Sequence, residues 1–254
     1  VYKRQPYNNI LLNKSINNIK SRRLFKEVSK KVENGSSNNL KIINITVDEQ
    51  ATGEISAGAG VGTDGTSFQF AVKENNWLGE GKNVSFDLDL DQESLRGTLN
   101  YIDPNYNFSG NAVTAGLDVS STDRSNSSGF SSSKTGVLLG TSFEQYEDIY
   151  FSPTISINHE NIKAESTASD SIKKMDGNYF NSDFTYGITL DKRNQSFQPT
   201  DGYATSFFQS LPIIQDSSSI MNNFIFNKYH QFSEDLIGSL KIYGKTINGI
   251  DDDV

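Results

Sequence analysis

The sequence predicts a mainly β protein: a transmembrane antiparallel β-barrel, partial and with about eleven strands, that follows a small α+β module. Three observations carry this prediction. Apolar and polar residues alternate with a period of two over most of the chain beyond residue 50. The 254 residues include 20 Gly, 16 Phe and 11 Tyr but no Cys, and such a composition is typical of β structure. No apolar run approaches the ~18 residues that a membrane-spanning helix needs.

Charge divides the chain near residue 50. The first 50 residues carry ten Lys or Arg against four Asp or Glu, whereas the rest carry thirteen against twenty-seven. A change of sign of this size predicts two domains, residues 1–50 and residues 51–254. Ile, Leu and Phe at core spacing interleave the basic residues of the first domain. This pattern favours a solvated basic face, so nucleic acid is not expected as a partner.

The first domain is predicted to contain a helix, a strand, a turn and a second strand. Apolar residues recur at helical spacing over residues 7–20, and Pro6 suits the first turn of that helix. Residues 24–32 and 40–47 are predicted strands on either side of the turn signal Asn34-Gly35. A segment of about 50 residues is too short for a sizeable core of its own.

The second domain is predicted as strands alone, with no helix after residue 54. In residues 84–91, four apolar side chains share one face of the strand, while a Ser and three Asp share the other. Residues 113–120 and 184–191 repeat this alternation. The eleven predicted strands are residues 54–62, 66–74, 81–91, 94–101, 109–120, 134–144, 149–162, 179–191, 202–212, 218–230 and 236–247.

Period-two alternation fits a soluble β-sandwich as well as a membrane barrel, and three features favour the barrel. Many predicted strands approach the ~9–11 residues that cross a bilayer. The polar face is rich in Asp, Ser, Asn and Thr, as a wet lumen would be. Short connections alternate with long Ser-rich ones at 121–133 and 163–178. Because closed bacterial barrels have even strand numbers, eleven strands predict an incomplete barrel whose closing strands follow Val254.

Three carboxylates, Asp87, Asp89 and Asp91, are predicted to form an acidic row that faces the lumen. Their spacing resembles the start of a calcium loop, but Gln92 and Thr98 occupy the positions where an EF-hand needs Gly and Glu. Alternate positions also place the carboxylates along one strand face and not around an ion. No metal or other cofactor is therefore expected.

Two other patterns are weak signals of nucleotide binding or catalysis. Gly60 to Gly65 matches G-x-G-x-x-G, yet a strand-like segment follows it where a nucleotide site needs a helix. A tight hairpin at Thr63-Asp64-Gly65 is predicted there. His159 and His230 have acids nearby, but no G-x-S-x-G elbow accompanies either. An outer-membrane hydrolase is the enzymatic alternative, which an esterase assay of variants at both histidines would test; the prediction is that the protein is not an enzyme.

Residues 54–62 have strand spacing but are filled with Gly and Ala. Gly weakens a strand because it adds backbone entropy and brings no side chain to pack. As the first strand of a barrel, this segment is predicted to be a seam that opens and offers its unpaired N–H and C=O groups to another chain. A bend, or tight packing against a plug, is the alternative explanation. The predicted seam consists of Glu54, Ile55, Ser56, Ala57, Gly58, Ala59, Gly60, Val61 and Gly62.

A series of motifs resembles the BamA family of outer-membrane β-barrel assembly proteins. In chain order, the motifs resemble the last helix and two strands of a POTRA (polypeptide-transport-associated) domain, the start of the family's barrel, its first periplasmic turn and a later strand–turn signature. The residues are 7–48, then Gln50-Ala51-Thr52-Gly53-Glu54-Ile55 with Gly62-Thr63-Asp64-Gly65, then Asn76-Trp77-Leu78-Gly79-Glu80-Gly81, and finally Asp191-Lys192-Arg193-Asn194 with Pro199-Thr200-Asp201-Gly202.

The resemblance implies a bacterial outer-membrane protein, with its partial POTRA domain in the periplasm, that folds and inserts other barrel proteins without ATP. It implies that residues 54–62 are one side of a lateral gate. The implied partners are unfolded outer-membrane client proteins, accessory assembly lipoproteins and membrane lipid. A related two-partner secretion or translocation barrel that exports a specific partner is the alternative. A passive porin needs no POTRA-like module, so residues 7–48 argue against it.

Overall fold

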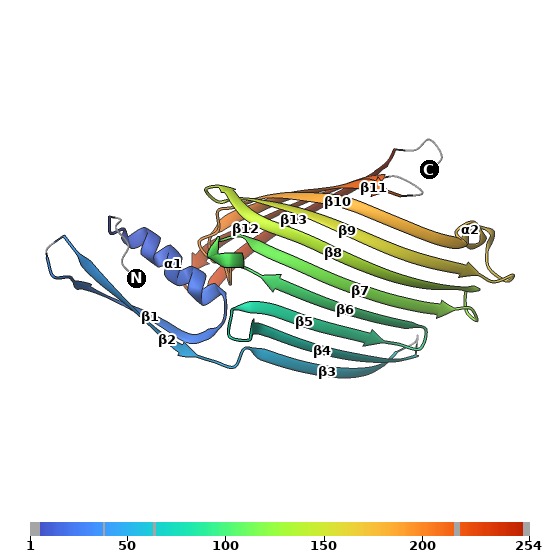
Figure 1. Cartoon of the computed structure of the whole chain (residues 1–254), viewed down its shortest axis with the longest axis horizontal. Coiled ribbons are helices and arrows are strands. Elements are labelled where there is room, and N and C mark those ends of the chain that lie inside the picture. The colour runs from blue at the N-terminus through green and yellow to red at the C-terminus, as the bar shows by residue number, and fades with distance from the viewer. Residues whose placement is uncertain (1–5, 38, 63–64, 216–218, 251–254) are drawn as a thin grey trace.

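The computed structural model describes residues 6–37, 39–62, 65–215 and 219–250. It has two parts: a small module with one helix and a two-stranded sheet, and an eleven-stranded antiparallel sheet. Figure 1 shows the strands of the large sheet running side by side, with α1 and the small sheet at one end and α2 at the other. Among the described residues, no helix is both long and apolar enough to cross a membrane.

Helix α1 spans Asn9–Ser21 and begins at a side-chain cap. The Asn8 carboxamide oxygen accepts the N–H groups of Ile10 (2.8 Å) and Leu11 (3.3 Å). These are donors that the first turn of a helix leaves without a partner. The prediction that Pro6 lies in the first turn is wrong, because the cap residue separates Pro6 from the helix.

Strands β1 (Phe25–Asn34) and β2 (Lys41–Glu49) form an antiparallel hairpin against α1. The helix reaches β1 but leaves the apolar side chains of β2 41–48% exposed. The predicted order of helix, strand and strand is confirmed, while the assignment of this module to a POTRA domain stays a prediction. Its small core consists of Leu12, Ile16 and Val28, with Ile19 and Phe25 packed against them.

All eleven strands predicted for the second domain are present, and most are longer than predicted. The reason is that backbone pairing continues past the point where apolar alternation ends. The strands are β3 (Gly53–Gly62), β4 (Gly65–Trp77), β5 (Lys82–Leu90), β6 (Ser94–Asp103), β7 (Ala112–Arg124), β8 (Phe130–Tyr146), β9 (Ile149–Ala164), β10 (Gly177–Asp191), β11 (Gly202–Ile214), β12 (Ser219–Ser233) and β13 (Leu236–Gly249).

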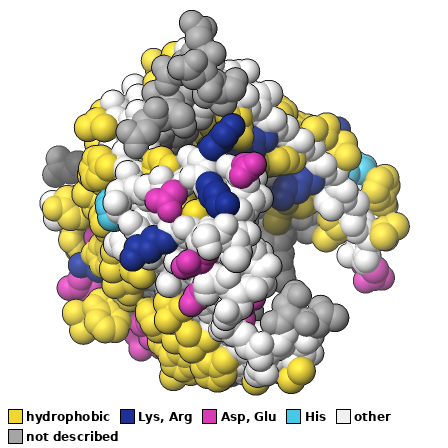
Figure 2. Space-filling view, turned by 90° about the vertical axis from the view of Figure 1, so that its right-hand side faces the viewer, with side chains coloured by type: hydrophobic (Ala, Val, Ile, Leu, Met, Phe, Trp, Pro, Cys, Tyr) yellow, Lys and Arg dark blue, Asp and Glu magenta, His cyan; other side chains and the backbone are white. Residues whose placement is uncertain are grey.

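Each strand of the large sheet pairs with its neighbours in the sequence, in the order β13 to β3. All of these pairings are antiparallel. Strands β3 and β13 are the two edges, so the described sheet is curved but not closed into a barrel. Figure 2 shows this shape as a ring with a gap on one side.

The two faces of the large sheet differ in polarity. One row of directly paired residues on the convex face is apolar and 38–46% exposed, which no covering protein layer would allow. Hydrophobic side chains gather along the outside of the ring in Figure 2. This arrangement contradicts a sandwich and fits a sheet whose convex face meets lipid. The row consists of Phe86, Leu99, Leu117, Val137 and Ile157, and the next row, on the concave face, of Asp87, Thr98, Asp118, Gly136 and Asn158.

The prediction that no helix follows residue 54 is wrong at two connections. Helix α2 (Asp170–Lys173) lies between β9 and β10, and a 3₁₀ turn, η1 (Tyr106–Phe108), lies between β6 and β7. The Ser169 hydroxyl accepts the N–H of Ile172 at the start of α2. Each element is a single turn, too short for an apolar helical period to reveal it.

The difference in connection length between the two ends of the sheet is smaller than predicted. The predicted loop at 121–133 is wrong, since pairing continues to Arg124↔Phe130 and only residues 125–129 connect the strands. Ser and Thr predominate in this paired extension, so it shows no apolar alternation. The connection between β9 and β10 is long, as predicted, but residues 192–201 form a comparable one at the α1 end.

Two turns are predicted from Gly-containing signals, one after β1 and one between β3 and β4. Asn34 ends β1, and the connection to β2 covers residues 35–40, closed by the Gly35 N–H donating to the Leu40 carbonyl (2.8 Å). The pairing of β3 with β4 ends at Gly62↔Gly65. Thr63 and Asp64, where a tight hairpin is predicted, lie outside the described residues.

Candidate functional site

Strand β3 is one exposed edge of the large sheet. It pairs with β4 from Gly53 to Gly62, and no strand lies on its other side among the described residues. All ten of its residues are exposed, including Ile55 (74%) and Val61 (87%). The backbone N–H and C=O groups of such an edge are available to pair with another strand.

Close packing explains only part of the glycine content of β3, at Gly53, where an added Cβ would lie 2.9 Å from the Glu74 carboxylate. A Cβ added to Gly58 would meet no atom within 4 Å, and one added to Gly60 would meet only the Ser67 hydroxyl, at 3.1 Å. Tight packing against a plug, the alternative explanation, therefore has no support in the described part of the chain. The remaining physical effect of these glycines is to weaken the strand through backbone entropy.

The structure places Asp87 and Asp89 on the concave face of β5, which β4 separates from β3. Together with Ser56 and Gly58 of β3 they line a hollow of about 310 Å³. Asp89 is directly opposite Arg96 of β6, so part of this negative charge lies beside a cation. In the described residues, no group of three or more His, Asp or Glu is arranged to hold a metal ion.

Asp91, the third residue of the predicted acidic row, lies just beyond the strand that carries the other two. β5 ends at Leu90, and Asp91 lies in the turn that leads to β6. Its carboxylate accepts the hydroxyl (2.6 Å) and the N–H (2.6 Å) of Ser94, and the N–H of Glu93 (2.9 Å). The Ser94 hydroxyl is the main cause that holds the pKa of Asp91 below its ordinary value. Asp91 therefore stabilises a turn.

The two histidines do not form a hydrolytic site within the described residues. His159 lies on β9 opposite Thr135 and Phe180. His230 lies on β12, where its Nδ1 is 3.4 Å from Asp201 and its ring contacts Phe232 edge-on. No serine hydroxyl bonds to either ring in this part of the chain, so the geometry offers no activated nucleophile.

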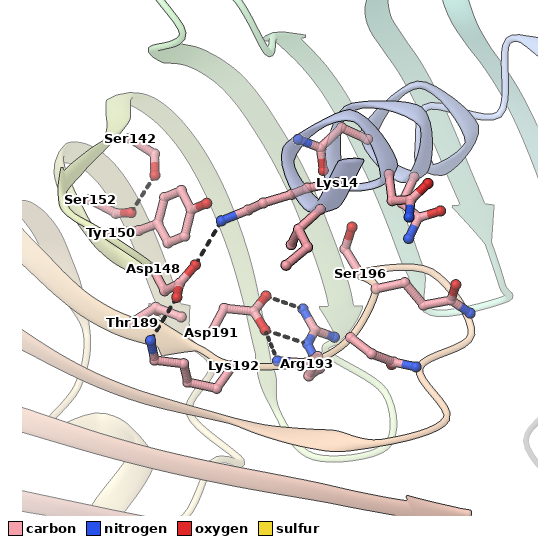
Figure 3. A pocket seen from close by; sticks show the side chains of 16 residues that line it. Lys14, Ser142, Asp148, Tyr150, Ser152, Thr189, Asp191, Lys192, Arg193 and Ser196 are labelled. Carbon is pink, nitrogen blue, oxygen red and sulfur yellow. Dashed lines mark hydrogen bonds and ion pairs between the residues drawn. The ribbon is translucent and has the colours of Figure 1, made fainter. Parts of the chain in front are cut away.

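A second candidate site is a cavity of about 720 Å³ between α1 and the ends of β8, β9 and β10. We call it the mouth cavity, because it lies at the α1 end of the curved sheet. Figure 3 shows Lys14 extending from the helix to Asp148 in the β8–β9 turn, with the loop 192–196 opposite. The concave face of the sheet contributes Ser142, Ser152 and Thr189.

The charged side chains of the mouth cavity are paired with one another. The Asp148 carboxylate accepts hydrogen bonds from Lys14 Nζ (3.0 Å) and Lys192 Nζ (2.7 Å). Beside it, the Arg193 guanidinium donates to both oxygens of Asp191, at 2.8 and 2.6 Å. Asp148 therefore joins the helix to the connection that follows β10.

A second contact joins the small module to the same connection. The Arg23 guanidinium lies 4.7 Å from the centre of the Phe197 ring, a cation–π distance. Gln50 Nε2 donates to the Arg23 carbonyl (2.8 Å) and so fixes the position of this segment. Two independent contacts, Lys14 with Asp148 and Arg23 with Phe197, therefore hold the small module at this end of the sheet.

A family comparison identifies the superfamily. The model of the Omp85 superfamily domain matches residues 76–253, which is more than half of the chain. This chain belongs to the Omp85 superfamily. An Omp85 β-barrel implies a location in the outer membrane, which agrees with the apolar convex face.

A solved structure supports the fold of this Omp85 chain. It is similar to the crystal structure of BamA from Haemophilus ducreyi lacking POTRA domains 1–3, with a TM-score of 0.58 and 15% sequence identity. The match covers 92% of this chain and 49% of that one, so the chain spans about half the length of its structural relative. At this identity the likeness establishes a BamA-like fold.

The Asp148 contact of this Omp85 protein is expected to depend on charge. Hydrogen bonds from Lys192 and Lys14 hold the pKa of Asp148 below its ordinary value near 4, and the bond to Asp148 raises the pKa of each lysine. The contact is therefore complete at neutral pH. It is lost when the pH falls through the lowered pKa of Asp148, or rises through the raised pKa of the lysines.

Replacement of Asp148 with asparagine is expected to loosen α1 from the sheet. Each pair is partly exposed and weakened by solvent, so we expect a several-fold rise in the undocked population. Spin labels at Ser21 and Tyr146, measured by pulsed electron paramagnetic resonance, should report a broader distance distribution in Asp148→Asn. Asp235→Asn, in another turn at the same end, is the control that should leave the distribution unchanged. An unchanged distribution in Asp148→Asn would show that the ion pairs do not hold the helix.

Sequence reasoning did not identify the mouth cavity. Lys14 and Asp148 are 134 residues apart, and no sequence pattern links the two. The one available signal is the strand–turn signature from Asp191 to Asn194, whose charged residues line the cavity. That signature indicates a turn but says nothing of the helix opposite.

Proposed function

We propose that this Omp85 protein folds β-barrel proteins and inserts them into the outer membrane, with β3 as one side of a lateral gate. The observation that carries the proposal is that the first strand of the sheet holds glycines at positions 58 and 62, where no neighbouring atom requires a glycine. A weak seam strand separates easily from its neighbour and leaves backbone groups unpaired. In lipid such groups are costly until another strand pairs with them.

The side-chain pattern of β3 suits a strand that templates a client by β-augmentation. Ile55, Ala57, Ala59 and Val61 are in register with the convex apolar rows of β4, while Ser56 and Gly58 lie on the concave face. A client strand with the same alternation would continue both faces of the sheet. Strand pairing of this kind needs no chemical step, so we propose a function without catalysis or a bound cofactor.

The small module is proposed to lie in the periplasm, as the end of a POTRA domain within residues 1–50, and to contact clients or accessory lipoproteins. The position of α1 supports this orientation, because the helix and the paired extension of β7 and β8 lie at opposite ends of the sheet. Its basic residues would meet acidic surfaces of such partners. Membrane lipid is the proposed partner of the convex face.

A disulfide across the gate tests the proposal. The variant pairs Gly58→Cys with a Cys in the last barrel strand of the full-length protein. The 254 residues contain no Cys of their own, so none of them competes for this disulfide. Client insertion into lipid vesicles should fall at least tenfold when the pair is oxidised and recover on reduction. A control pair, Thr185→Cys with Ser210→Cys, bridges neighbours that already share a 2.9 Å hydrogen bond and should have no effect.

Normal insertion by the oxidised gate pair would contradict the proposal. It would favour the alternative function, a two-partner secretion or translocation barrel that exports a specific partner. The polar concave face is the observation behind this alternative, because a partner that crosses through a wet lumen does not require an open seam.

A further inference from the structure

A row of polar side chains crosses the convex face of the sheet at β10 to β13. Its orientation follows from the apolar convex row, in which Ile157 pairs with Ser182 of β10. Every second residue of a strand faces the same way, so the side chain four positions after Ser182 also lies on the convex face. The members of this polar row are paired directly across four strands and are Tyr186, Gln209, Asn222 and Thr246.

Hydrogen bonds join the four side chains of the polar row. The Tyr186 hydroxyl donates to the Gln209 carboxamide oxygen (2.8 Å), and Gln209 Nε2 donates to Asn222 Oδ1 (2.7 Å). Asn222 Nδ2 then donates to the Thr246 hydroxyl oxygen (3.2 Å). Each carboxamide has a second N–H, and the Thr246 hydroxyl keeps its own hydrogen. Within the described residues, these three donors have no bonded acceptor.

Apolar side chains flank the polar row on both sides, so the row lies within the apolar belt of the convex face. The row contains no cation that would hold the phosphate of a lipid headgroup. Lipid tails offer no acceptor, and unpaired donors are costly among them. The flanking residues, each two positions from the row along its strand, are Phe184 and Ile188 on β10, Phe207 and Leu211 on β11, and Ile220 and Phe224 on β12.

We propose that the polar row is a contact surface for a second copy of this protein, side by side in the outer membrane. A carboxamide carries a donor and an acceptor, and its oxygen has a second lone pair. The second N–H groups of Gln209 and Asn222 in one copy can therefore bond to the carboxamide oxygens of the other copy. Phe207 and Phe224, which are 36% and 44% exposed, pack around these bonds and keep them dry.

Membrane geometry favours a second copy over a different partner. All copies share one orientation and one depth in the bilayer, so a twofold axis along the membrane normal brings the two rows together at matching depth. A different membrane protein would need its own polar groups at that depth. The contact is also separate from the proposed gate, because β3 is at one edge of the sheet and the row lies towards the other edge.

Energy transfer between copies of the full-length protein in lipid vesicles tests the proposal. Separate samples carry donor and acceptor dyes at Asp235→Cys, in the turn between β12 and β13. Transfer should rise with the density of protein in the membrane. The double variant Gln209→Leu with Asn222→Leu should raise the density for half-maximal transfer at least tenfold, because it removes hydrogen bonds from both sides of a twofold contact.

The matched control removes a polar pair from the concave face of the same strands. Thr185→Val with Ser210→Ala breaks a 2.9 Å hydrogen bond between β10 and β11 and should leave energy transfer unchanged. Absence of transfer at every density would overturn the proposal and would favour a different membrane protein as the partner of the row. An equal shift in the control, or none in the double variant, would also overturn it.

A disulfide between copies tests the contact without removing its apolar surroundings. In an otherwise cysteine-free full-length protein, Gln209→Cys should give a disulfide-linked dimer when the vesicles are oxidised. Leu99→Cys, on the convex face of β6 and away from the row, should stay monomeric under the same conditions. Equal cross-linking at both positions would show random collision in place of a specific contact, and would contradict the proposal.

Discussion

Replacement of Leu99 with arginine is expected to lower the free energy of unfolding by about 2–4 kcal/mol, the cost of a cation on the lipid face near the bilayer midplane. Leu99 is at the centre of β6, 44% exposed, and lies between Phe86 and Leu117 in the apolar convex row. Its direct neighbours among the described residues, Phe86 and Leu117, give a guanidinium no acidic partner. Urea unfolding of the full-length protein in lipid vesicles measures the effect.

Thr98→Arg is the matched control, one residue earlier on the same strand. Thr98 lies on the concave face, directly between Asp87 and Asp118. An arginine there would be in water and near two carboxylates, so a change within about 0.5 kcal/mol is expected. If the control lost as much stability as Leu99→Arg, the assignment of the convex face to lipid would be wrong.

The same alternation explains how much of this fold the sequence can predict. Alternate residues of a strand face two different environments. Each strand follows this rule separately, and pairing then aligns the apolar residues of neighbouring strands into the convex row that includes Phe86 and Ile157. Strand number and order therefore follow from local patterns. Strand ends do not, because pairing at Arg124↔Phe130 depends on backbone groups whose side chains carry no pattern.

The candidate sites likewise include features that a local sequence pattern predicts and features that depend on the folded sheet. The edge strand β3 could be predicted from its glycines and its place at the start of the sheet. The carboxylate spacing of the predicted acidic row continues past the end of β5, so it does not reveal that Asp91 bonds to Ser94 in the turn. The pair of Lys14 with Asp148 could not be predicted, since only the folded sheet brings its turn to the helix.

Replacement of Gly202 with alanine is expected to be the most damaging small change at the α1 end. Gly202 has a φ of +96°, a left-handed value that alanine adopts only with strain. An added Cβ would also overlap the Lys192 carbonyl oxygen and lie 2.9 Å from the Arg193 Cα, both backbone atoms that cannot rotate away. Strain and overlap together predict a loss on the order of 3 kcal/mol.

The effect should reach the mouth cavity, because the connection between β10 and β11 brings Gly202 against Lys192 and Arg193, which line that cavity. The Lys192 N–H donates to the Tyr203 carbonyl (2.8 Å), and the Asn194 N–H donates to the Asp201 carbonyl (3.0 Å). If Gly202 moves away from this backbone, Lys192 is withdrawn from Asp148, so Gly202→Ala should also broaden the Ser21–Tyr146 distance distribution. Gly244→Ala, whose Cβ would meet nothing within 4 Å, is the control that should change neither measurement. A stable Gly202→Ala protein with an undisturbed distance would show that the connection tolerates the strain, and that the close approach to Lys192 is not what holds the loop.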